Sequence, residues 1–264
     1  MNARVMRWLA FAAALGACSG RARPSPLAAV DVAERTGARL PLALAFRDAD
    51  GARVGLASAF APGKPVLLTL AWYRCTMLCP LVLHGTAAST RETAAVPGRD
   101  YRLLTVSIDP RDGPAEAARI RREIAARAPD AGAAWAFWTG EGDAIDRLAS
   151  DLGFRYAWDP GTRQFAHPAV AVLLTPAGRI SRYFYGTRID PAELDAAIAV
   201  AAREGTTTAL ERFVLRCFHF TPALRRYGAA VMASVRGGGV LVLAGIVGLM
   251  ALLVVRTRRR EAAR

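Results

Sequence analysis

The sequence predicts an α/β fold, with a mostly parallel sheet covered by helices on both faces. Strand-like and helix-like segments alternate between residues 64 and 203, which is the pattern of parallel sheets whose strands are joined by helices. Near the end of this region, two strand-like segments flank the turn sequence TPAG and should add an antiparallel hairpin. Both ends of the chain combine basic residues with apolar runs, so we expect the folded part to lie between membrane-directed segments.

The expected elements follow one another in the order strand, helix, strand, helix, strand, helix, hairpin and helix. Apolar segments bounded by turn residues predict strands at 64–73, 101–108, 134–139, 169–174 and 179–185. Alanine-rich segments of helical composition predict helices at 81–93, 114–127, 143–152 and 191–203. Pro114 stands in the first turn of the second helix, where proline is favoured, and Asp109 with Pro110 should end the second strand.

The net charge of +13 is concentrated at the ends of the chain. Residues 1–24 carry +4 and residues 202–264 carry +8, so residues 25–201 carry only +1. A nearly neutral middle argues against nucleic-acid binding, whereas basic residues beside apolar runs are typical of membrane targeting. We expect no nucleic-acid partner, and one anchored domain gives no reason to expect more than a monomer.

Residues 1–24 predict an export signal. A basic start precedes an apolar run from Trp8 to Ala17, which is too short to cross about 30 Å of hydrocarbon as a helix. The sequence LGAC ending at Cys18 also resembles a bacterial lipobox. In that interpretation Cys18 is acylated and becomes the mature amino terminus. Ordinary cleavage nearby, or an uncleaved anchor, is the alternative.

Residues 237–255 (GGGVLVLAGIVGLMALLVV) predict a transmembrane helix. As a helix this uncharged run would be about 28 Å long, close to the thickness of the hydrocarbon core. The basic tail, residues 256–264, follows at once and favours the cytoplasm. With residues 204–236 as a juxtamembrane linker, the domain of residues 25–203 should face the periplasm from the bacterial inner membrane. Paired cysteines could form a disulfide there.

Cys75 and Cys79 lie in WYRCTMLCPLVLH, between the first predicted strand and the first predicted helix. Ligands of α/β sheets gather at the carboxyl ends of strands, and positions four apart on a helix face the same way. A helix amino terminus lowers the pKa of a thiol and makes thiolate available near neutral pH. The pair could therefore be redox-active, bind a metal or be buried packing residues.

The C-x3-C spacing helps to choose among metals. Zinc sites and thioredoxin-type exchange enzymes more often use C-x2-C. Two thiolates and one imidazole form a soft site suited to copper. His167 lies in a loop just before the hairpin and could reach back over the cysteines, although spacing alone does not establish that pairing.

Three segments within residues 45–203 carry a family resemblance: GKPVLLTLAWYRCTMLCP, LLTVSIDPRDGP and GFRYAWDPGTRQFAHPAVAVLLTPAGRISRYFYG. In this order they resemble the Sco/SenC family of copper-binding assembly proteins for cytochrome c oxidase. The later segment CFHFTPALRRYGAAVM, followed by the apolar run, resembles a bacterial branch with a C-terminal membrane anchor. The resemblance implies a thioredoxin-like fold, which is a mixed central sheet flanked by helices.

The resemblance also implies a site and a role. The implied copper ligands are Cys75, Cys79 and His167, and Asp109 would support them, although an Asp before Pro also caps strands routinely. The implied role is that of a metallochaperone and not an enzyme. It would bind Cu(I) or Cu(II) and dock transiently on the apo copper-binding subunit of cytochrome c oxidase. The alternative is an exported thiol-disulfide oxidoreductase or thioredoxin-like peroxidase, in which Cys75 attacks and Cys79 resolves.

Some residues depart from the family pattern or fall outside it. Many members have Pro after the first cysteine, where this chain has Thr76. His84, five residues after Cys79, is either a spare ligand or a packed helix residue. Cys217 and His219, close to the predicted span, could hold copper or pack a juxtamembrane helix.

Overall fold

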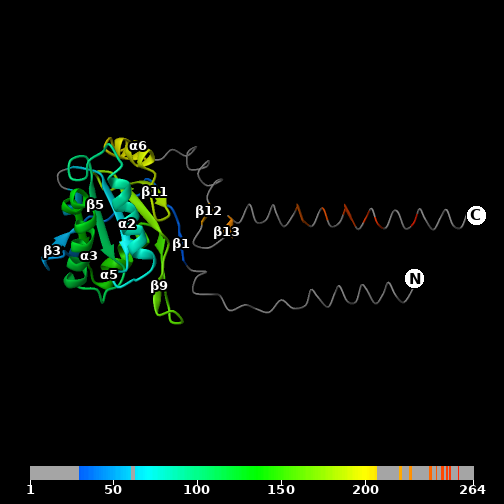
Figure 1. Ribbon diagram of the computed structural model, residues 1–264, viewed down its shortest axis with the longest axis horizontal. Helices are drawn as coiled ribbons and strands as arrows, with labels where there is room; N and C mark the ends of the chain where they lie inside the picture. The colour runs from blue at the N-terminus through cyan, green and yellow to red at the C-terminus, as the bar shows by residue number, and fades with distance from the viewer. Residues whose placement is uncertain are drawn as a thin grey trace, which may run out of the picture.

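A five-stranded sheet forms the centre of the computed structural model, with helices on both of its faces (Figure 1). The structure describes residues 30–60 and 63–206, together with isolated positions from residue 220 onward. In spatial order the strands are β11 (Ile180–Tyr185), β10 (Val170–Leu174), β4 (Val66–Ala71), β5 (Arg102–Ser107) and β6 (Trp135–Trp138).

The direction of the strands confirms the predicted sheet and its late hairpin. β4, β5 and β6 run parallel, whereas β10 is antiparallel to both β11 and β4. In the β10–β4 pair, Ala171 lies opposite Thr69 and Leu174 lies opposite Val66. The start of β10 therefore lies beside the carboxyl end of β4, and the residues just before β10 come close to those just after β4.

The helices divide between the two faces of the sheet, and α2 and α3 lie side by side over one face (Figure 1). That face packs against α2 (Leu78–Thr90), α3 (Pro114–Arg127), the short α4 (Pro129–Ala133) and α6 (Pro191–Ala201). The other face packs against α5 (Gly142–Asp151) and the 3-10 helix η2 (Leu56–Phe60).

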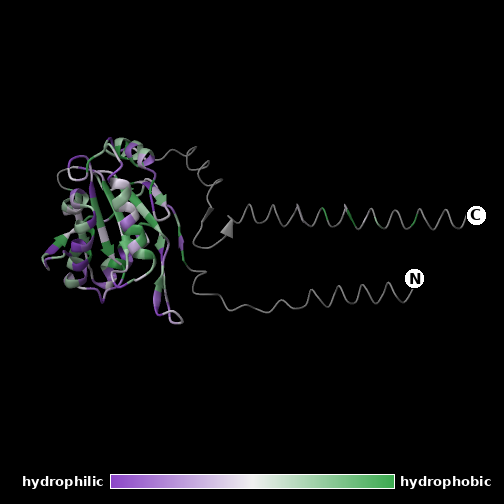
Figure 2. Ribbon diagram, in the orientation of Figure 1, coloured by the Kyte–Doolittle hydropathy of each residue, from purple (hydrophilic) through white to green (hydrophobic). Residues whose placement is uncertain are grey.

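Alternation along β4 explains why both faces are covered. Leu67 and Ala71 join the core beneath α2, α3 and α6, whereas Val66, Leu68 and Leu70 join the core beneath α5. Side chains alternate between the faces of a strand, so a strand that is apolar at both parities must be buried on both sides. Figure 2 shows the apolar residues concentrated in these central strands.

One helix boundary differs from the prediction in a way that affects the site. The helix predicted at 81–93 begins at Leu78 and ends at Thr90. Cys79 therefore belongs to the first helical turn, whereas the sequence interpretation placed the helix after both cysteines. No side-chain hydrogen bond caps the helix at Met77, so the sequence carries no capping signal there, and the apolar pattern from Leu81 onward marked the start too late.

Several short strands were not predicted from the sequence. They are β1 (Asp31–Val32), β2 (Ala45–Arg47), β3 (Arg53–Gly55), β7 (Phe154–Arg155), β8 (Ala157–Asp159) and β9 (Gln164–Ala166). Segments of two or three residues are too short to show a period of two. The β1–β7 pair depends on Gly153, because its φ is +65° and a Cβ there would lie 1.9 Å from the carbonyl oxygen of Ala33.

The predicted membrane-directed segments lie outside the described residues, wholly or for the most part. They are the export signal with Cys18, the linker 204–236, the span 237–255 and the tail 256–264. Within the part of the chain that the structure describes, no helix is both long and apolar enough to cross a membrane. The export signal, the span and the periplasmic location therefore stay predictions.

Candidate metal centre

Residues 72–79, called the cysteine segment below, leave the carboxyl end of β4 and turn into α2. The Cys75 N–H donates to the carbonyl of Trp72 at 3.1 Å, which closes a tight turn directly after the strand. Cys79 is buried in the first turn of α2, whereas Cys75 is only partly buried, and both are free thiols. The backbone N–H of Trp72 lies 3.4 Å from Cys79 Sγ. The segment therefore stacks one accessible thiol over one enclosed thiol.

The pKa of Cys75 is lowered from 9.0 to about 5. The main cause is a hydrogen bond from the Cys79 thiol, and backbone N–H groups of Cys79, Met77 and Leu78 add to it against the opposing effect of burial. At the start of a helix, backbone N–H groups have no carbonyl of a preceding turn to bind, so they favour a negatively charged acceptor. Cys75 is therefore a thiolate at neutral pH.

Cys79 Sγ lies 2.8 Å from His167 Nε2. The other ring nitrogen, Nδ1, lies 3.0 Å from the carbonyl oxygen of Pro168. A carbonyl oxygen only accepts hydrogen bonds, so Nδ1 carries the proton and Nε2 presents a lone pair to the sulfur. Burial lowers the pKa of His167, which keeps the imidazole neutral and able to bind a metal.

The three atoms that could bind a metal, the sulfurs of Cys75 and Cys79 and Nε2 of His167, thus share one proton. The hydrogen bond to Cys75, followed by burial, raises the pKa of the Cys79 thiol far above its ordinary value. Its single S–H faces two acceptors, the Cys75 thiolate and His167 Nε2. A soft cation could replace that proton and meet two sulfurs and one nitrogen.

Residues 157–168, called the histidine segment below, bring His167 to the cysteines. The segment consists of the β8–β9 hairpin, which projects from the sheet (Figure 1), and the two residues that follow it. The Phe165 ring lies 5.0 Å from that of Trp158 and 5.7 Å from that of Trp72, between ring centroids. Because Trp72 begins the cysteine segment, these aromatic contacts join the two segments next to the thiols.

Asp109 contacts two residues of the cysteine segment. Its fully buried carboxylate follows β5 and accepts from Trp72 Nε1 and from Arg74, both at 3.0 Å. It also accepts from the backbone N–H and guanidinium of Arg111. Burial acts to raise the pKa of Asp109, but the hydrogen bonds from Arg111 outweigh it and the pKa is lowered. Asp109 is thus both a turn cap and a positioning residue.

Asp112 is a second buried carboxylate, which sequence reasoning missed. It accepts from the Tyr73 backbone N–H at 3.0 Å, from Arg74 Nε at 2.7 Å and from Ser107 Oγ at 2.6 Å. The signal that could have found it is the second acid of DPRD, three residues after Asp109 and beside the carboxyl end of β4. Together the two carboxylates fix Trp72, Tyr73 and Arg74, the three residues before Cys75.

The structure does not contain a preformed ligand triad. Cys79 contacts His167 and is hydrogen-bonded to Cys75. Even so, among the described residues no three or more His, Cys, Asp or Glu side chains are grouped closely enough to hold a metal ion. Binding through Cys75, Cys79 and His167 therefore requires a side-chain rotation, for which the partly exposed Cys75 has the greater freedom.

The other candidates from the sequence are less closely connected to the thiols. His84 projects from α2 toward α3, and its Nε2 lies 3.1 Å from Glu123 Oε1, as expected of a packed helix residue. It shares with both cysteines the lining of a cavity of about 30 Å³ between these helices. Cys217 and His219 lie outside the described residues.

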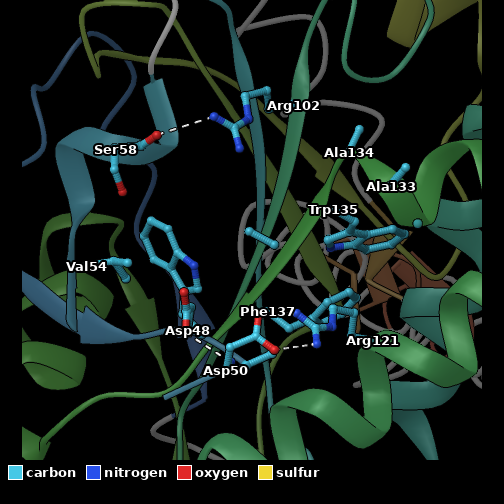
Figure 3. Close-up of a pocket in the computed structure, with 14 residues that line it drawn as sticks. Asp48, Asp50, Val54, Ser58, Arg102, Arg121, Ala133, Ala134, Trp135 and Phe137 are labelled. Carbon is cyan, nitrogen blue, oxygen red and sulfur yellow. Dashed lines mark hydrogen bonds and ion pairs between the residues drawn. The ribbon is translucent and has the colours of Figure 1, made fainter. Parts of the chain in front are cut away.

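A larger cavity, of about 490 Å³, lies along β6 at the edge of the sheet (Figure 3). Asp50 and Arg121 form an ion pair at its wall, with both nitrogen–oxygen distances at 2.7 Å. Neither the cysteines nor His167 line this cavity. This cavity is thus separate from the reactive thiols, so the chemistry of the donors identifies the candidate site.

The family model described as SCO1/SenC matches residues 36–203, which include both cysteines and His167. The chain belongs to the SCO1/SenC family. Comparison with curated protein sequences gives no match.

Several solved structures are similar to this family member, and two of them, with TM-scores above 0.5, share its fold. A candidate electron transfer protein of Aquifex aeolicus VF5 is 24% identical, with 64% of this chain and 95% of that chain covered and a TM-score of 0.56. A SCO1/SenC family lipoprotein of Bacillus anthracis is 19% identical, with 65% and 98% covered and a TM-score of 0.52. Arabidopsis thaliana ScoI, solved with copper bound, is 20% identical, with 64% and 99% covered and a TM-score of 0.48.

The mixed sheet flanked by helices agrees with the thioredoxin-like fold that the resemblance implied. At identities below 25%, the similar structures support the fold alone.

Proposed function

We propose that this protein is a membrane-anchored copper metallochaperone that binds copper through Cys75, Cys79 and His167. The observation that carries the proposal is the 2.8 Å contact between Cys79 Sγ and His167 Nε2, with the Cys75 thiolate hydrogen-bonded to the same thiol. Membership of the SCO1/SenC family supports it. The copper so bound would serve assembly of the copper centre of cytochrome c oxidase.

The donor set favours copper on chemical grounds. Thiolates are soft ligands that select Cu(I), and imidazole binds copper in either common oxidation state. Cys75 is already ionised and His167 is already neutral, so only Cys79 has a proton to lose. Binding should therefore release about one proton per metal ion at neutral pH.

The proposed partner and location extend the sequence interpretation. The apo copper-binding subunit of cytochrome c oxidase would dock transiently on a monomer held by the helix of residues 237–255. The domain would face the periplasm, with a second, lipid anchor if Cys18 is acylated. Copper is cargo in this role, so the protein would turn over no small molecule.

Titration with Cu(I) tests the proposed ligands. The full chain, solubilised in detergent and reduced without oxygen, is titrated against a competing chelator beside Cys75→Ser, Cys79→Ser and His167→Ala. We expect one tightly bound copper in the unsubstituted protein and a loss of at least about tenfold in affinity for each variant.

His84→Ala is the matched control, since it removes another histidine, which lies on the same helix as Cys79 and contacts Glu123 of α3. Its affinity should equal that of the unsubstituted protein. Equal copper binding by the three ligand variants would show that the proposed ligand set is wrong.

The lowered pKa of Cys75 favours a second candidate function, thiol-disulfide exchange. The Cys75 thiolate would attack a disulfide of a substrate protein and form a mixed disulfide. Cys79 would then displace the substrate as a dithiol and leave a Cys75–Cys79 disulfide, which an external thiol reductant must reduce. His167→Ala separates the two candidates, because it should remove copper binding and leave insulin disulfide reduction intact.

A further inference from the structure

Met77 stands between the two cysteines and is 63% exposed. It is the only methionine between residues 7 and 231, so the domain has one thioether, and that thioether lies in the cysteine segment. An exposed methionine contributes little to a core. Its sulfur is instead a soft, polarisable group at the surface of a site in which Cys79 and His167 are buried and Cys75 is partly buried.

Two contacts place Met77 across the junction of the cysteine and histidine segments. Its backbone N–H lies 3.5 Å from Cys75 Sγ. Its Sδ lies 3.7 Å from Gln164 Nε2, on β9 and three residues before His167. Cys79 and His167 join the two segments in the interior, whereas Met77 and Gln164 join them on the solvent side.

We propose that Met77 is an additional weak ligand, whose thioether binds Cu(I) during its transfer between the solvent side and the buried donors Cys79 and His167. This inference rests on the proposed copper-binding function. A thioether is neutral and has no proton to lose, and it favours Cu(I) over harder ions. Beside the Cys75 thiolate, it would let the metal exchange one sulfur ligand for another without passing through a state with no soft ligand.

An apolar docking role for the same residue makes a different prediction. Leu81 is 59% exposed one helical turn later, and Trp158 is 39% exposed on β8, so Met77 has apolar neighbours at the surface. Met77→Leu keeps the size and apolar character of the side chain but removes the sulfur. Leu81→Ala removes apolar area and keeps the sulfur, which makes it the matched control.

Methyl NMR of the full chain in detergent tests the contact directly. The protein is labelled with ¹³C at the methionine methyl groups, and the Met77 signal is identified by its absence from Met77→Leu. We expect one equivalent of Cu(I), added without oxygen, to shift the Met77 signal. Met77→Leu should still bind one Cu(I) but transfer it to a small chelator roughly tenfold more slowly, whereas Leu81→Ala should transfer it at the unsubstituted rate.

Two results would overturn the inference while the proposed function stands. The first is an unmoved Met77 signal in a protein that has bound one Cu(I). The second is a transfer rate of Met77→Leu that equals either the unsubstituted rate or the rate of Leu81→Ala. If the unsubstituted protein binds no Cu(I), the proposed function fails and this inference fails with it.

Discussion

The cysteine segment and the histidine segment meet at one site but are held in different ways. Buried carboxylates hold the cysteine segment through Trp72, Tyr73 and Arg74, and helix N–H groups stabilise its thiolate. Aromatic rings hold the histidine segment, and the antiparallel strand β10 anchors its end.

The difference matches what each segment supplies. Hydrogen bonds from the Cys79 thiol and from backbone N–H groups lower the pKa of Cys75, whereas burial lowers the pKa of His167 and keeps its imidazole neutral. A site for a soft cation needs both conditions next to each other. The two supports share Trp72 and otherwise rest on different residues, so Asp112 and Phe165 can each be replaced without changing the other.

Removal of the polar support should have the largest effect. Asp112→Ala leaves the buried Tyr73 N–H and Ser107 hydroxyl without their acceptor and Arg74 with only Asp109, and we expect a loss of about 3 kcal/mol in the free energy of unfolding. Urea denaturation of the reduced protein measures it. Asp50→Ala also removes an aspartate paired with an arginine, but at the surface, and should leave stability almost unchanged. Equal losses in the two variants would contradict the polar support.

Removal of the aromatic support should have a smaller effect on stability and a more selective effect on the site. Phe165→Ala loses ring contacts with Trp72, Tyr156 and Trp158. Because Phe165 is half-buried, we expect a loss of about 2 kcal/mol. Copper affinity should fall with the loosened His167, while alkylation of Cys75 keeps its rate. Phe165→Leu, the apolar control, should retain most of both properties; a changed Cys75 rate in Phe165→Ala would show that the supports are not separate.

The smallest expected effect concerns the pKa of Cys75 and involves only this thiol and its immediate neighbours. Its rate of alkylation by iodoacetamide should rise with pH through a midpoint near 5. Cys79→Ala removes the main donor to the thiolate, so the pKa should rise toward 9.0 and the midpoint should move to higher pH. An unmoved midpoint would assign the shift to the helix N–H groups alone.

The sign of the linked stability follows from the same lowered pKa. Stability from this ionisation is present in full above the ordinary thiol pKa of 9.0 and is lost as the pH falls through about 5.

The elements with regular patterns were predictable from the sequence. The strands and helices that bury whole faces, and the position of Cys75 and Cys79 at the end of β4, follow from local composition and from the geometry of parallel sheets. Asp109 was expected because its Asp-Pro pair ends a strand, and its carboxylate accepts hydrogen bonds from Trp72 and Arg74. Its support of a metal site stays a prediction.

The contacts that complete the site were not readable in this way. His167 meets Cys79 across 88 positions of sequence, and the meeting depends on β10 inserting beside β4. The β8–β9 hairpin, with three residues in each strand, is too short for a periodic signal. From the sequence alone, Asp112 would be taken for a surface acid. It is buried because Tyr73 and Arg74, which follow β4, lie against it and donate hydrogen bonds to it.

Trp72 belongs to both supports at once. Its ring faces Phe165 and Trp158, its indole N–H binds Asp109, and its backbone N–H approaches Cys79 Sγ. The protein therefore carries a fluorophore of its own at the junction of the two segments. Its emission should respond to oxidation or metal loading of the thiols in real time, with no added label, and Trp72→Phe identifies the share of the signal that comes from this one indole.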